Sequence, residues 1–138
     1  MPNGVDLILA DHEVLKGLFS QFDETHDVRL IGQVTAALKA LDDAEHAALY
    51  PMAWNILTDP NLNQRCEIAH SRIRDQIDVV VLLHGEPLIA AFRVLRDLVI
   101  EHVADEDGNM LAALSERASP QQLDVLGARI LRAKQHVG

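Results

Sequence analysis

Apolar residues recur at intervals of three and four along most of the chain, and this spacing is typical of amphipathic helices. Four long stretches carry such a stripe, at about residues 3–25, 28–57, 60–84 and 86–117, and a shorter one begins at 119. The fourth contains Gly108, where the helix could fray. Because the joints are short, consecutive helices are expected to lie antiparallel. The sequence therefore predicts an all-α fold, an up-down-up-down four-helix bundle with a short fifth C-terminal helix, as a single domain over residues 1–138.

Residues with known capping preferences mark the expected helix boundaries. Asn3 and Asp6 can cap the first helix, and Asp59-Pro60 supplies an N-cap and a first helical residue for the third. The run Ser119–Gln122 has the form of a capping box at the start of the fifth helix. Pro51 lies inside the second helix and is expected to bend it, because proline removes one backbone hydrogen bond.

Charge and composition exclude several classes of partner. The 138-residue chain has a formal net charge of −9 and no basic patch, so neither nucleic acid nor an anionic membrane is an expected partner. No apolar run approaches the roughly 20 residues of a membrane span, and the N-terminus lacks the pattern of a signal peptide. The single cysteine, Cys66, cannot form an internal disulfide. A cytoplasmic protein is the expectation.

Ionisable side chains interrupt the apolar stripes. His102 and Glu106 lie one turn apart on the core face of the fourth helix, and His12, Glu45 and His70 occupy the stripes of the other three long helices. Burying such groups without partners is costly, so they must either hydrogen-bond to one another or hold a metal ion. Imidazole and carboxylate together suit iron or zinc, and carboxylate bridging favours a pair of irons. Metal binding is therefore favoured over a purely structural polar core.

Neighbouring residues have alternative roles. Cys66, one turn before His70, could offer a thiolate, but a buried free cysteine is usually inert packing. Glu67 fits the Glu-x-x-His pattern of ferritin-like bundles, although a solvated or capping side chain is favoured. Tyr50 could hydrogen-bond near a metal or keep its hydroxyl in water at the rim of the bundle. Asp107, in an acidic run, is expected on a solvated face.

The remaining histidines are placed less favourably for metal binding. His46 lies about 100° around the helix from Glu45, so it is expected to point away from the centre. His26 and His84 fall at helix ends, and His136 lies near the C-terminus.

With these motifs, the chain resembles the hemerythrin-like (HHE cation-binding) domains along nearly its whole length. The matching segments are Asp11-His12, Glu45-His46-Ala47-Ala48-Leu49-Tyr50-Pro51, Ala69-His70 and His102-x-x-x-Glu106. The resemblance implies a four-helix bundle around an oxo- or carboxylate-bridged non-haem di-iron centre. The iron ligands that it implies are His12, Glu45, His70, His102 and Glu106, with the two glutamates as bridges. Asp42 matches a position where some members carry an additional acidic ligand.

One position departs from the family pattern. The second helix of these domains normally repeats His-x-x-x-Glu, but the residue four before Glu45 is Leu41. A leucine cannot ligate iron, so one iron would lack a nitrogen donor. The vacated position could be open, hold water or be filled by Asp42 or His46. The centre could then be asymmetric or mononuclear.

Three functions remain open. The resemblance, together with the lack of a nucleophile, phosphate loop or other cofactor motif, favours a protein that binds oxygen, nitric oxide or a related small oxidant for carriage, storage or sensing. The first alternative is a di-iron enzyme that decomposes peroxide at the coordination position left open by Leu41. The second is a metal-depleted bundle that serves as an interaction module.

Overall fold

The helices of the structure follow the apolar stripes of the sequence. A computed structural model describes residues 2–135, which form helices and turns without any strand, and His136 lies outside these described residues. In chain order, with η denoting a short π-helical segment, the elements are α1 (Gly4–Thr25), α2 (Arg29–Ala44), η1 (Glu45–Leu49), α3 (Tyr50–Leu57), α4 (Pro60–Val80), α5 (Gly85–Asp105), η2 (Glu106–Leu111), α6 (Ala112–Arg117) and α7 (Pro120–Gln135). Within residues 2–135, no helix combines the length and the apolar character that crossing a membrane requires.

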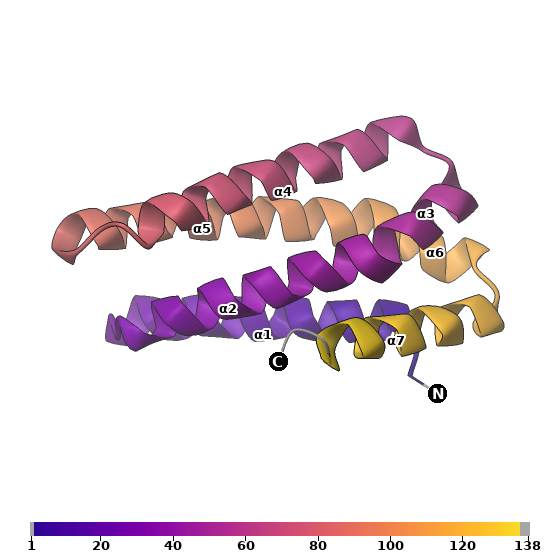
Figure 1. Cartoon of the computed structure of the whole chain (residues 1–138), viewed down its shortest axis with the longest axis horizontal. Coiled ribbons are helices and arrows are strands. Elements are labelled where there is room, and N and C mark those ends of the chain that lie inside the picture. The colour runs from indigo at the N-terminus through magenta and orange to yellow at the C-terminus, as the bar shows by residue number, and fades with distance from the viewer. Residues whose placement is uncertain (1, 136–138) are drawn as a thin grey trace.

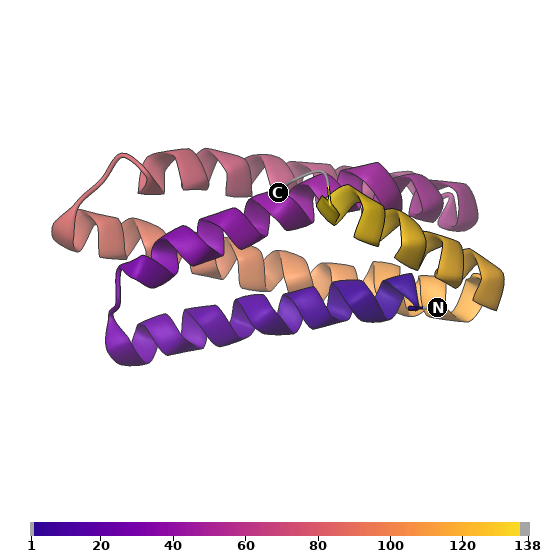
Figure 2. The same ribbon diagram turned by 60° about the horizontal axis from the view of Figure 1, so that its bottom comes forward.

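Antiparallel rods form the bundle (Figure 1, Figure 2). The first rod is α1, the second runs continuously through α2, η1 and α3, the third is α4, and the fourth runs through α5, η2 and α6. α1 packs on α2, α4 packs on α5, and α7 folds back along α1, α2 and η1. The predicted all-α, up-down-up-down bundle with a fifth C-terminal helix is therefore confirmed.

The predicted caps are present at three helix starts. The Asn3 side chain accepts N–H groups from the first turn of α1, which includes Asp6, and Asp59 does the same for α4. Ser119 and Gln122 form a reciprocal capping box, in which each side chain accepts the backbone N–H of the other. These bonds satisfy orphan N–H groups and fix where the rods begin.

The second rod contains the π-helical turn η1 directly before Pro51. The N–H of Tyr50 donates to the carbonyl of Glu45, five residues back instead of four. Pro51 has no N–H to donate and lies in the first turn of α3, where the hydrogen-bond pattern returns to that of an α-helix. The irregularity expected at Pro51 is thus a wider turn just ahead of it.

The fourth rod contains a corresponding turn, η2. It begins at Glu106 and includes Gly108, and the N–H of Ala112 donates to the carbonyl of Asp107. The rod continues through this glycine, so the expectation of fraying there was wrong. Each π-helical turn therefore begins at one of the two glutamates that the sequence places in a core stripe.

The last helix, α7, packs so closely on the start of the chain that one of its positions has no room for a side chain. Leu126 and Ile130 of α7 are fully buried. A Cβ added at Gly127, between them, would collide with the backbone oxygen of Pro2, whereas a Cβ at Gly17 on α1 would meet open space. The contact between α7 and the start of α1 therefore depends on glycine at position 127.

This contact generates a stability prediction. We expect Gly127→Ala to lower the free energy of unfolding by about 1–3 kcal/mol, because the added methyl group forces α7 away from Pro2. The matched control Gly17→Ala should raise it by about 0.5–1 kcal/mol, since alanine is the better helix former at an open position. Urea unfolding followed by circular dichroism measures both. Equal effects of the two substitutions would contradict the close packing of α7 at position 127.

Candidate metal centre

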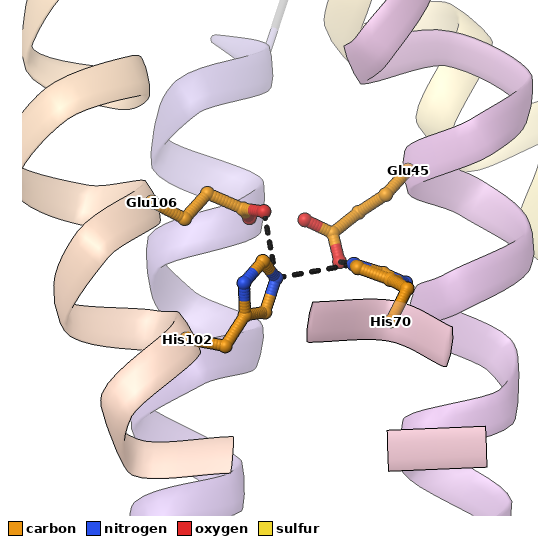
Figure 3. Close-up of side chains that lie close together, drawn as sticks. All are labelled: Glu45, His70, His102 and Glu106. Atoms are coloured by element: carbon orange, nitrogen blue, oxygen red, sulfur yellow. Dashed lines mark hydrogen bonds and ion pairs between the residues drawn. The ribbon is translucent and has the colours of Figure 1, made fainter. Parts of the chain in front are cut away.

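The five ionisable residues of the core stripes lie together, and each long rod contributes at least one of them. His12 comes from α1, Glu45 from η1, His70 from α4, His102 from α5 and Glu106 from η2, and none is more than 6% exposed. Potential ligand atoms of Glu45, His70, His102 and Glu106 all lie within 4.8 Å of one another, and Figure 3 shows these side chains pointing toward a common centre. His12 approaches through its Nε2, 3.4 Å from Oε1 of Glu106.

The inner atoms of the cluster face one another at short range. Nε2 of His102 lies 3.1 Å from Nε2 of His70 and 3.0 Å from Oε2 of Glu106. Nε2 of His70 lies 3.5 Å from Oε1 of Glu45. Nitrogen lone pairs and carboxylate oxygens turned toward one point are the arrangement that a cation stabilises.

Aspartates outside the cluster orient two of the histidines. With Nδ1 protonated, His12 donates to Oδ1 of Asp107 at 2.6 Å and His70 donates to Oδ1 of Asp42 at 2.7 Å. Each bond leaves the Nε2 lone pair free and directs it inward, as in the carboxylate–histidine pairs that support metal ligands. Arg74 in turn holds both oxygens of Asp42. Asp107, expected on a solvated face, is 26% exposed there, but it also bonds to His12, a role that the sequence did not indicate.

Asp42 and His46 do not fill the position left by Leu41. The Oδ atoms of Asp42 are engaged by His70 and Arg74 on the outer side of the cluster. His46 lies beyond His70, with Nδ1 2.9 Å from Oδ1 of Asp42 and Nε2 2.8 Å from Oε1 of Glu67. Both residues thus support the cluster from outside it.

Tyr50 places its hydroxyl at the centre of the cluster, not at the rim. The side chain is 4% exposed, and its oxygen lies 2.6 Å from Nε2 of His70 and 2.7 Å from Oε2 of Glu106. The same oxygen is 3.5 Å from both Oε2 of Glu45 and Nε2 of His102. A phenol oxygen is therefore a sixth potential donor, in a site where Leu41 supplies none.

The π-helical turn explains why the sequence left the role of Tyr50 open. On a regular α-helix, residues five apart point roughly 140° away from each other, so Tyr50 and Glu45 could not share a face. In η1 five residues make about one turn, which brings Tyr50 under Glu45. The Tyr50-Pro51 pair next to a core glutamate is the only signal in the sequence that could have suggested this.

Three buried acidic groups, those of Glu45, Tyr50 and Cys66, keep their protons in the absence of a metal. Burial and the adjacent Glu106 carboxylate raise the pKa of Glu45 well above its ordinary value. Burial, Glu45 and Glu106 also raise the pKa of Tyr50, and burial raises the pKa of the Cys66 thiol to about 12. A cation at the centre would favour loss of the Glu45 and Tyr50 protons, because it stabilises the anionic oxygens.

Buried polar atoms that lack a hydrogen-bond partner indicate whether these residues fit a metal. Among the described residues, Nε2 of His12, Nδ1 of His102 and Oε1 of Glu106 are buried without a hydrogen-bond partner. Leaving such atoms unpaired costs free energy, and two of them point toward the cluster as potential ligands. Three imidazoles, two carboxylates and a phenol form a nitrogen and oxygen donor set that suits iron. The residues present fit a metal.

The fold matches that of a protein of known structure. The structure superposes on a hemerythrin HHE cation-binding domain-containing protein from Mycobacterium kansasii with a TM-score of 0.85, covering 99% of this chain and 88% of that one at 18% identity. The chain therefore has the hemerythrin-like fold that its sequence resembles. No protein-family model matches the sequence.

A curated relative shares only part of its length with this chain. A DNA nickase from Nostoc sp. (strain PCC 7120 / SAG 25.82 / UTEX 2576) is 26% identical over 144 residues. The alignment includes 96% of this chain but 39% of that protein. The chain thus spans well under half the length of the relative.

The position of Tyr50 generates a spectroscopic prediction. Tyr50 is the single tyrosine of the chain, so any phenolate-to-iron(III) absorption band must come from it. We expect iron(III)-loaded protein to show such a band in the visible region, and Tyr50→Phe to lose it while the helical content stays unchanged. Trp54→Phe, a substitution of an aromatic residue that is half exposed, should keep the band. Iron-loaded wild type without the band would contradict a phenol donor.

Proposed function

We propose that this chain is a non-haem iron protein of the hemerythrin-like kind, built as one domain. We assign the iron ligands to His12, Glu45, His70, His102 and Glu106, with Tyr50 as a sixth donor. The two glutamates are the residues that would bridge a pair of irons. The observation that carries the proposal is the convergence of these buried donors, including orphaned atoms of His12 and Glu106, within a bundle of hemerythrin-like fold.

We further propose that the centre binds a small oxidant, oxygen or nitric oxide, for carriage, storage or sensing. Iron supplies a redox-active Lewis acid when it is bound. Leu41 supports this role because it lines an opening beside His12, Glu45, His70 and His102 without offering a donor of its own. A small molecule can therefore approach the donors from that side. The donor side chains are at most 6% exposed, which limits side reactions of a bound oxidant with bulk water.

A second candidate function is the decomposition of peroxide. It is favoured by the opening beside the donors, where Leu41 supplies no ligand, because peroxide turnover needs an exchangeable position on the bound iron. Oxygen evolution from hydrogen peroxide by the iron-loaded protein distinguishes this function from simple binding. A metal-depleted module is less favoured, because the orphaned buried atoms would then be a cost without benefit.

We do not extend DNA nicking to this chain. The nickase name belongs to a Nostoc protein of which this chain matches 39%. A net charge of −9 opposes binding to a phosphate backbone, because few cations are available to replace its counterions.

The assignment of ligands predicts a loss of metal in specific variants. We expect His70→Ala, His102→Ala and Glu106→Ala each to lower bound iron to below about half of the wild-type content, because each removes an inner donor. His84→Ala is the matched control, since this exposed histidine precedes α5 and belongs to neither candidate group of metal ligands. Iron per chain after reconstitution is measured by atomic emission. Unchanged iron in all three variants would show that the ligands are assigned wrongly.

Acidification should release the metal before the bundle unfolds. Burial lowers the pKa of His12, but the carboxylates of Glu106 and Asp107 outweigh it, so the net shift is upward. Burial and His102 lower the pKa of His70, which keeps that ring neutral at neutral pH. Iron requires neutral imidazole, so His12 is the ligand for which protons compete first. Because its pKa lies above the ordinary value of 6.5, this competition begins near or above that pH. Iron absorbance and helicity, followed together in one pH titration, should show separate transitions. A single coincident transition would contradict this order.

A further inference from the structure

A cavity of about 620 Å³ opens between α2 and α4 and ends at the metal donors. Its buried end is formed by His12, Glu45, His70 and His102, and its open end includes the exposed Val81 just after α4. The walls between these ends are aliphatic: they are formed by Leu15, Leu38, Leu41, Ile73, Ile77 and Val99. Leu41, one turn before Glu45, extends the apolar wall up to the cluster itself.

The cavity is much larger than a diatomic molecule or peroxide requires. A closed apolar cavity of about 150 Å³ already accommodates benzene, and pockets for organic ligands span about 300–1,000 Å³. The space beside the cluster therefore has the size of an organic ligand several times larger than benzene.

The charges around the cavity indicate an uncharged occupant. Arg74, on the wall, is held by both oxygens of Asp42 and is not free to bind an anionic head group. At the opening, the exposed Lys39 lies among the acidic residues Asp43 and Asp78. These five side chains together carry three negative and two positive charges, so the opening does not favour an anion. The aliphatic walls offer no hydrogen bonds to a polar body.

We propose that this cavity binds an uncharged, apolar organic molecule, whose inner end lies against the donors of the metal centre. The contact with the metal rests on the proposed iron site, whereas binding to the aliphatic walls does not. The cavity then provides the space in which such a molecule meets the small oxidant that the centre binds.

The binding is tested by fluorescence with the neutral probe N-phenyl-1-naphthylamine, using both metal-free and iron-loaded protein. We expect the probe to bind both forms and 1-decanol to displace it. Decanoate, with the same chain length and a negative charge, should compete at least ~tenfold more weakly because the opening opposes anions. No binding to either form would overturn the proposal, and stronger competition by decanoate would overturn the uncharged class of ligand.

Substitutions that fill the cavity locate the ligand. Ile77→Trp should weaken probe binding at least ~tenfold, because the indole occupies the space between α2 and α4. Ile68→Trp is the matched control on α4, since Ile68 is 45% exposed and does not line the cavity. Ile73→Phe fills the same space with a smaller side chain if the tryptophan variant unfolds. The proposed location would be overturned if the control weakened probe binding equally, or if neither cavity-filling variant weakened it.

Measurements on the iron-loaded protein distinguish this proposal from the proposed function. Bound decanol should shift the absorption of the iron centre, and an unchanged spectrum at saturating decanol would overturn the placement of the inner end. Iron content is measured on the same samples without the probe. If the protein binds no iron, probe binding to the metal-free protein still supports the cavity proposal. If the protein binds iron but not the probe, only the cavity proposal is refuted.

Discussion

The burial of two glutamates side by side is the constraint on which the structure depends. Glu45 and Glu106 are at most 1% exposed and lie in a core that is otherwise largely aliphatic. Two ionised carboxylates in such a place repel each other and lose their hydration, so one of them, Glu45, keeps its proton while no cation is present. The histidines, the outer aspartates and Tyr50 form a polar network that makes this burial tolerable. The surrounding rods must hold that network in place, which accounts for the length and continuity of all four.

Much of the architecture could be predicted from the sequence, because it depends on patterns that do not require tertiary information. The spacing of apolar residues sets the rods, and the caps at Asn3, Asp59 and Ser119 set where they begin. The five stripe residues could be placed in one interior for the same reason. An ionisable residue in phase with an apolar stripe must face the core on any regular helix.

The features that the sequence left open or misplaced depend on departures from regular geometry. Tyr50 reaches the centre only through the wider turn η1, which cannot be read from a period of 3.6 residues. Asp107 lies off the core face of its own rod and becomes important because His12, 95 residues away, comes beside it. The cavity between α2 and α4 depends on the distance between the two helices, which apolar stripes alone do not specify.

The four rods form two helical hairpins, residues 4–57 and 60–117, and each hairpin needs the other to orient one of its histidines. His12 of the first hairpin is held by Asp107 of the second, and His70 of the second is held by Asp42 of the first. Neither half contains a complete set of donors, so the centre exists only when the halves have docked in the correct register. The metal would thus act as a cross-link between complementary fragments. Its occupancy would report correct assembly of the whole bundle, much as activity reports the reunion of a split enzyme.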